Sequence, residues 1–129
     1  MYRHTLVEDV QKVIEQVRRL HGEFTLAMLY NNALDARFSW NLIVAAPWLD
    51  QLSLATGTRM IVDALYQNLK LENKGSISRV TVLKTTEPFV QDMTSLYPVS
   101  APGSRFPVDQ LTAGELSGSG VILYSQAAA

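Results

Sequence analysis

The sequence predicts an α+β fold with one antiparallel or mixed sheet of four to five strands, two main helices and a short third helix. Two patterns carry this prediction. An apolar stripe with helical spacing runs through residues 6–20, and a run of apolar residues from Leu42 to Ala46 ends at Pro47. The stripe is typical of an amphipathic helix, and the bounded run is typical of a strand buried on both faces. Further patterns extend the order to α-β-β-α-β-α-β, which favours helices packed against a sheet.

The first expected helix follows Thr5. Thr5 and Glu8 have the spacing of a capping box, in which each side chain bonds the other residue's backbone N–H. Gly22 suits the end of the helix, because glycine tolerates the backbone conformation that is common there. The apolar positions of this helix recur three or four residues apart and are Leu6, Val10, Val13, Ile14, Val17 and Leu20.

Two strands are expected next. Phe24–Tyr30 places alternate apolar side chains on one face, which predicts a strand. Asn31–Arg37 is a polar turn, short enough for an antiparallel hairpin. Phe38–Ala46 is then the returning strand, and the proline after it stops the pairing.

The second main helix is expected to begin at Asp50 or Ser53 and to end near Lys70. A third strand follows at residues 77–84, where valines alternate with polar residues. Thr86 is the expected cap of the short third helix, since threonine at this position can accept a backbone N–H.

The last part of the chain is richer in serine, glycine and proline. These residues predict a long connection over 100–119, with room for a short strand at 105–108. Ser117–Gly120 fits neither a nucleophile elbow nor a phosphate-binding loop, so we interpret it as a turn. Gly120–Ser125 is the final strand, and residues 1–129 are expected to form one domain.

The composition limits which binding partners and which cellular compartment we expect for the protein. Hydrophobic residues make up 47% of the chain and charged residues only 18%, which favours a homodimer that hides apolar surface. The formal net charge is -1, so electrostatics give no attraction to nucleic acid or to an anionic membrane. The chain has no cysteine, no signal-peptide pattern and no apolar run of membrane-spanning length, so we expect a cytoplasmic protein.

No catalytic, metal-binding or cofactor-binding motif is found. His4 and His21 are the only histidines, and their spacing matches no metal-ligand pattern. The sequence therefore predicts no catalytic residue, no metal and no cofactor. Nucleic-acid binding through the neighbouring Arg18 and Arg19 is the weakest hypothesis, because the net charge of the chain is near zero.

Four residues around the buried strand are the candidates for a ligand site or an interface. Trp40 and Trp48 are interpreted as core or interface anchors, with a pocket wall as the alternative. Asp50 is interpreted as a residue that caps or starts the second main helix, with a general base or metal ligand as the alternative. Asn41 would hydrogen-bond a ligand if the enzyme hypothesis holds.

Three segments, Trp40–Asp50, Ile77–Met93 and Val121–Ser125, together resemble a family of small uncharacterised bacterial proteins. These proteins share the segment W-[DN]-L-[VI]-V-[AS]-A-P-W-L. Asn41 stands where aspartate is commoner in that family, so a chemical role of that acid would be missing here. The resemblance implies a bacterial, cytoplasmic setting and no particular activity.

Two functions from different classes remain open at this point. The first is a non-catalytic interaction or regulatory module, self-associating as a dimer and with a possible protein partner. The alternative is a small enzyme or ligand-binding protein with a pocket near Asn41, Trp48 and Asp50.

Overall fold

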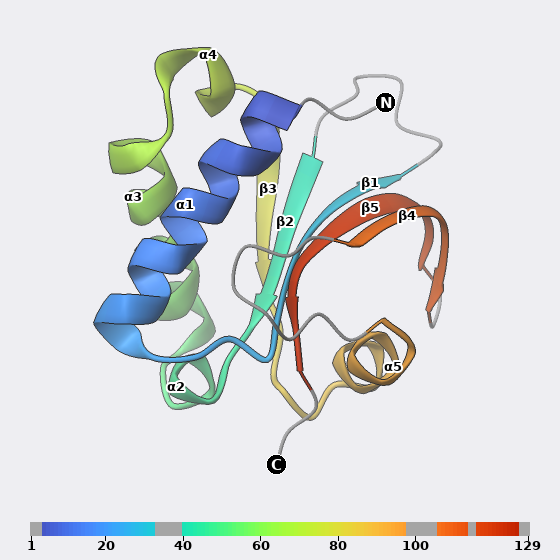
Figure 1. Ribbon diagram of the computed structural model, residues 1–129. Coiled ribbons are helices and arrows are strands. Elements are labelled where there is room, and N and C mark those ends of the chain that lie inside the picture. Colours follow the sequence, from blue (N-terminus) through green and yellow to red (C-terminus); the bar gives the residue numbers. More distant parts are fainter. Residues whose placement is uncertain (1–3, 33–39, 98–105, 114–115, 127–129) are drawn as a thin grey trace.

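The computed structural model describes residues 4–32, 40–97, 106–113 and 116–126. It contains a five-stranded sheet with helices on both faces (Figure 1). The elements, in chain order, are α1 His4–His21, β1 Leu26–Asn32, β2 Trp40–Ala45, α2 Pro47–Asp50, α3 Leu54–Asn68, α4 Leu71–Lys74, β3 Ile77–Val82, α5 Pro88–Leu96, β4 Phe106–Ala113 and β5 Leu116–Ser125.

The sheet is mixed, and its strand order is β3-β2-β1-β5-β4. β1 and β2 pair antiparallel with Leu29 opposite Leu42, so the predicted antiparallel pairing is confirmed. Asn31 and Asn32, which were expected in the turn, end β1, and the rest of the predicted turn lies outside the described residues. β3 pairs parallel with β2, because the chain crosses through α2, α3 and α4 before it returns. The α+β class predicted from the sequence is therefore confirmed.

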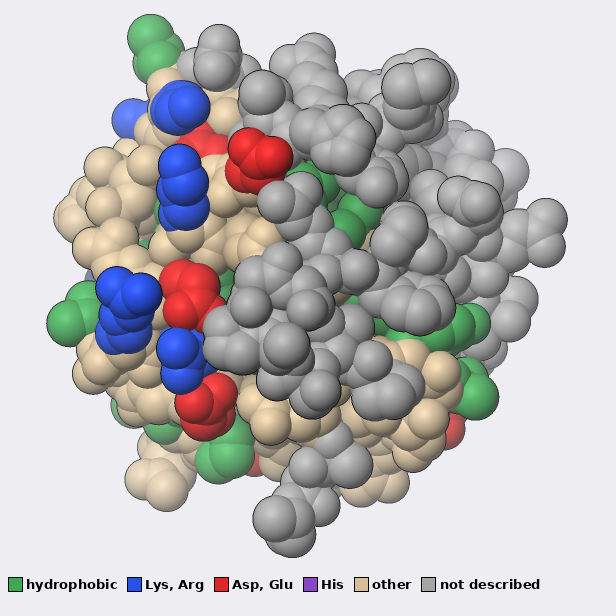
Figure 2. All heavy atoms as spheres, viewed as in Figure 1, with side chains coloured by type: hydrophobic (Ala, Val, Ile, Leu, Met, Phe, Trp, Pro, Cys, Tyr) green, Lys and Arg blue, Asp and Glu red, His purple; other side chains and the backbone are tan. Residues whose placement is uncertain are grey.

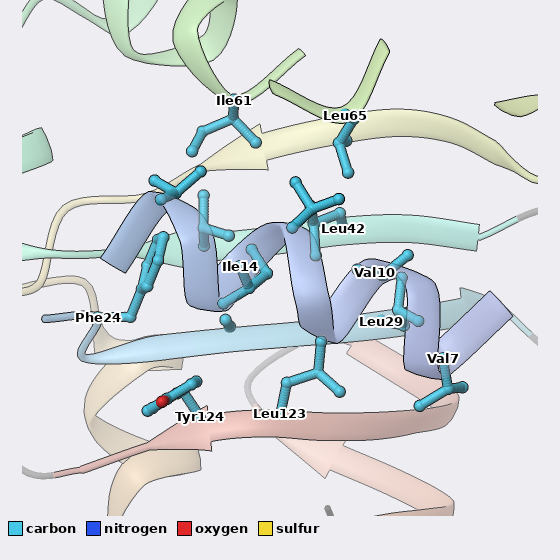
Figure 3. Close-up of a cluster of buried hydrophobic side chains, with 14 of the residues drawn as sticks. Val7, Val10, Ile14, Phe24, Leu29, Leu42, Ile61, Leu65, Leu123 and Tyr124 are labelled. Atoms are coloured by element: carbon cyan, nitrogen blue, oxygen red, sulfur yellow. The ribbon is translucent and has the colours of Figure 1, made fainter. Parts of the chain in front are cut away.

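The main core lies between the sheet and the pair α1 and α3. The apolar stripe of α1 faces β1, β2 and β5, and α3 adds Ile61 and Leu65 from the side (Figure 3). A smaller core on the other face joins α5 to the sheet through Val90 and Met93. Both faces of the central strands are thus removed from water, which explains the unbroken apolar run in β2.

Two predicted helix starts need correction, and for the second main helix one of the two predicted starts is confirmed. α1 begins at His4, so Thr5 lies inside the helix and is not its cap. Of the two predicted starts of the second main helix, Ser53 is confirmed and Asp50 is wrong: Ser53 caps α3, because its hydroxyl accepts a hydrogen bond from the Thr56 N–H at 3.1 Å. Glu87 takes the cap position of α5 in place of Thr86. The physical reason in the last two cases is proline, which is suited to the first turn of a helix and starts α2 and α5 directly.

The predicted connection over residues 100–119 is wrong where the structure describes it, at 106–113 and 116–119, and its other residues lie outside the described part of the chain. The short strand expected at 105–108 is confirmed over 106–108, within β4. Residues 106–113 and 116–125 form the antiparallel pair β4 and β5, and the segment interpreted as a turn lies within β5. Small residues fit there because β5 runs close to β1: a Cβ on Gly120 would lie 2.7 Å from the Leu29 carbonyl oxygen. Pairing on both sides of β5 thus overrides the weak strand preference of glycine and serine.

Candidate functional site

The edge strand β3 carries the feature that we assign as the candidate site. β3 pairs with β2 and with no other strand in the described part of the chain. The Leu83 N–H donates to the Val44 carbonyl at 2.9 Å across this ladder. Since successive backbone groups point to opposite sides of a strand, the N–H and C=O groups of Val80 and Val82 point away from β2. They form a short open edge that can pair with another strand.

A groove runs beside this edge, between α3 and β3. Its volume is about 160 Å³. Tyr66 stands at the groove with 67% of its surface exposed, which is unusual for a large aromatic side chain. Together these features give the groove an apolar floor with an aromatic rim. The residues that line it are Val62, Leu65, Tyr66, Leu69, Lys74, Ile77, Ser78, Arg79 and Val80.

The charges at the groove are of one sign. Lys74 places its Nζ 5.4 Å from the centre of the Tyr66 ring, a cation–π contact. Arg79 is exposed on β3 and also lines the groove. Among the described residues, no carboxylate lines the groove. Its polar character is therefore cationic.

The position of Lys74 depends on a buried carboxylate of α1. Asp9 is 6% exposed, and one of its oxygens accepts from the Lys70 N–H at 2.8 Å and from the Asn73 side-chain amide at 2.9 Å. Asn73 is itself buried. Both donors flank or belong to α4, so Asp9 fixes this short helix against α1 and thereby one end of the groove.

Trp48 lies over the turn between α1 and β1. Its indole N–H donates to the Gly22 carbonyl at 3.2 Å, and its ring stacks on His21 with centroids 5.0 Å apart. The edge of the indole also meets Phe24, at 5.7 Å. Trp48 is only partly buried and anchors α2 to the end of α1.

Asp50 connects α2 to the loop after β3. Its carboxylate accepts from the Thr85 N–H at 3.1 Å and from the Thr85 hydroxyl at 2.5 Å. Its backbone carbonyl accepts from the Lys84 ammonium at 2.8 Å. The carboxylate thus binds a loop, and the helix-capping role expected from the sequence is wrong.

Trp40 and Asn41 lie at the other end of β2. Trp40 is 8% exposed and belongs to the main core. The Asn41 side-chain oxygen accepts from the Thr81 hydroxyl at 3.0 Å, on the opposite face of the strand. Asn41 lies five residues before Ala46, which is roughly 16 Å at the usual rise per residue of a strand. The structure therefore does not bring Asn41 together with Trp48 and Asp50.

A polar cluster at the end of α1 has perturbed acidity. The Tyr124 hydroxyl donates to Glu15, which also accepts two hydrogen bonds from Arg18. Burial, and then the bond to Glu15, raise the pKa of Tyr124 to about 12. Burial alone would raise the pKa of Glu15, but the hydrogen bonds from Arg18 and Tyr124 outweigh it and lower that pKa. Both shifts move the pKa values of these groups away from neutral pH, whereas a general acid or base needs a pKa near neutral pH. The cluster is therefore better suited to a structural role.

A second, more polar hollow of about 270 Å³ lies between α1 and α3 and includes His21 and Asp63. Within the described residues, no three histidine, aspartate or glutamate side chains are placed to hold a metal ion. No described helix has the length and apolar character needed to cross a bilayer. Comparison of the chain with protein-family models, curated proteins and solved structures finds no match.

The residues of the groove were not among the candidates found from the sequence. Tyr66, Lys74 and Arg79 look like ordinary surface residues when only their spacing is considered. One signal was present: the third strand alternates valine with polar residues, whereas the second is apolar without interruption from Leu42 onward. Such alternation indicates a strand with one wet face and fits a place at the edge of the sheet.

Proposed function

We propose that the chain is a non-catalytic protein-interaction module that binds an extended segment of protein along β3. The observation that carries the proposal is the open edge at Val80 and Val82 beside an apolar groove. Addition of a strand to such an edge gives affinity through main-chain hydrogen bonds, and the groove gives specificity through side chains. The surface needs no bound cofactor.

The contacts of the sequence-based candidates support this class over an enzyme. Trp48, Asp50 and Asn41 each use their polar side-chain group within the fold, on Gly22, Thr85 and Thr81 respectively. Among the described residues, acidic and basic side chains are interspersed over the α1 side of the molecule (Figure 2), so these residues offer nucleic acid no basic patch there.

Three narrower expectations from the sequence stay predictions. We propose that the module works in a bacterial cytoplasm, in line with the resemblance of its Trp40–Asp50 segment. We also propose that it self-associates as a homodimer. Light scattering at micromolar concentration tests the dimer, and a monomer at every concentration would contradict it.

A peptide selection tests the proposed function. The full chain is used to select binders from random eight-residue peptides, and the selected peptides are mapped by amide NMR. The proposal expects shifts and slowed hydrogen exchange at the Val80 and Val82 amides, since these would donate to the added strand. Selected peptides that map only to the hollow between α1 and α3, or a selection that yields no binder, would contradict it.

A further inference from the structure

We infer that the natural occupant of the groove is an extended segment of a different protein in which apolar and acidic residues alternate. This inference rests on the proposed function and adds the chemistry of the partner. It follows from three properties of the edge: the direction of its free backbone groups, the faces on which its side chains stand, and the sign of its charge.

The backbone fixes the conformation of the partner. The free N–H and C=O groups of Val80 and Val82 recur every second residue, so only an extended chain can bond both of them. The register of β3 against β2 shifts between Trp40 and Asn41, because Trp40 lies opposite Ile77 and Asn41 lies opposite Arg79, so Ser78 is the extra residue. Such bulges end regular pairing. The usable edge is therefore short and centred on residues 80–82.

The side chains fix the pattern of the partner. Val80 and Val82 pack with the α3-side core. Thr81 stands on the other face, where it bonds Asn41, and Arg79 shares that face because it is two residues away. A strand added beside β3 would alternate in the same way. One set of its side chains would enter the groove between α3 and β3, and the other set would lie beside Arg79.

Charge selects acidic residues for the second set. Arg79 is exposed on one face, Lys74 borders the groove, and no described carboxylate lines it. Carboxylates of the second set, which would lie beside Arg79, would be attracted to its guanidinium, whereas lysines there would be repelled. The apolar set would fill a groove that contains Leu65, Leu69 and the exposed Tyr66 ring. Exposed aromatic side chains of this kind often dominate binding energy.

The same charge disfavours a second copy of the chain on this edge. Residues 76–86 contain Arg79 and Lys84 and no acid. Two copies paired through β3 would bring these two cations from each chain into one interface without a compensating carboxylate. Like charges that face each other across strands are destabilising. A homodimer would therefore use another surface.

Two acetylated probe peptides test the inference with the full chain. One alternates valine with glutamate over eight residues, and the other alternates valine with lysine. Binding is measured by fluorescence anisotropy at low and at high salt, and the contact is mapped by amide NMR. We expect the glutamate peptide to bind, to protect the Val80 and Val82 amides, and to bind more weakly as salt rises. We expect no binding of the lysine peptide.

Substitutions of exposed side chains test which residues contribute to peptide binding. Arg79→Glu should weaken binding of the glutamate peptide about fivefold or more, since it replaces an attraction by a repulsion. Tyr66→Ala should weaken it by a similar factor through loss of the aromatic rim. The matched control is Arg59→Glu, which reverses an exposed cation of α3 that does not line the groove and should leave binding unchanged. Circular dichroism confirms that each variant is folded.

The outcomes separate the inference from the proposed function. If both peptides protect Val80 and Val82 equally, and Arg79→Glu has no effect, the acidic partner is excluded while the strand-binding function stands. If the chain alone forms a dimer with these two amides protected, the occupant is a second copy and the inference is again overturned. If the glutamate peptide does not bind and the selected peptides also leave both amides unprotected, the inference and the proposed function fail together.

Discussion

Asp9 offers the sharpest test of how this fold is held together, because one buried carboxylate connects α1 to α4. We predict that Asp9→Ala destabilises the protein strongly. The change removes the acceptor for the Lys70 N–H and for the Asn73 amide. Asn73 is 1% exposed, so its amide cannot turn to water without opening the structure.

The expected loss follows from these two bonds. A hydrogen bond to a charged group contributes about 1.5–3 kcal/mol, and a buried donor left without an acceptor costs about 1–3 kcal/mol. Part of this loss is offset because the desolvation of the carboxylate is also removed. We therefore expect the free energy of unfolding to fall by about 3 kcal/mol, a large share of the roughly 5–15 kcal/mol typical of a domain.

Urea denaturation followed by circular dichroism measures this loss. With a slope of about 1.5 kcal/mol per molar urea, the midpoint should fall by about 2 M. Lys12→Ala is the matched control, because Lys12 is exposed on the same helix and should change stability by less than about 0.5 kcal/mol. A double-mutant cycle with Asn73→Ala should give a coupling of at least about 1 kcal/mol. An Asp9→Ala variant as stable as the control, or a coupling near zero, would refute the assigned role of the carboxylate.

Further predictions concern the end of α1. Gly22→Ala should lower the free energy of unfolding, measured in urea, by about 1–3 kcal/mol, because Gly22 has a φ of 131° and an added Cβ would lie 3.1 Å from Trp48. Gly75→Ala is the control and should leave this free energy nearly unchanged, because an added Cβ there meets nothing within 4 Å. Tyr124 has its pKa raised from 10.0 to about 12, so the fold prefers the neutral phenol. The stability that this shift contributes to the fold is complete below pH 10 and is lost as the pH rises through about 12. In thermal melts between pH 9 and 11.5, the melting temperature should therefore fall less for Tyr124→Phe than for the wild type. Glu15 has a pKa that is lower in the folded protein than the ordinary value of 4.5. The stability that this shift contributes is therefore present above pH 4.5 and is lost as the pH falls through the folded pKa. Melts between pH 6 and 3 should accordingly show a weaker acid destabilisation for Glu15→Gln, and equal profiles would contradict the assigned hydrogen bonds.

The interpretation of Trp48 shows where residue type was informative and where it was not. A large semi-polar ring after a strand was expected to act as an anchor, and in the structure it packs on His21 and Phe24. Its partners could not be predicted, because they come from a turn 26 residues earlier in the chain, joined to it by the hydrogen bond to Gly22. The same holds for Asp50, whose partner Thr85 is 35 residues away.

Local patterns determined the framework of this protein. The stripe of α1, the apolar run of β2 and the proline after it follow from periodicity and backbone restriction, which act within a few residues. Those signals were sufficient for the α+β class and for the antiparallel pairing of β1 with β2.

Only the tertiary structure decided which strand lies at the edge and what surrounds it. The pairing of β4 with β5 came from contacts between strands, against the local preference of their glycine and serine residues. The groove likewise exists because the chain crosses over and places β3 parallel to β2 and beside α3. Tyr66, Lys74 and Arg79 meet there through packing and long-range pairing, whose energies depend on residues far apart in the sequence.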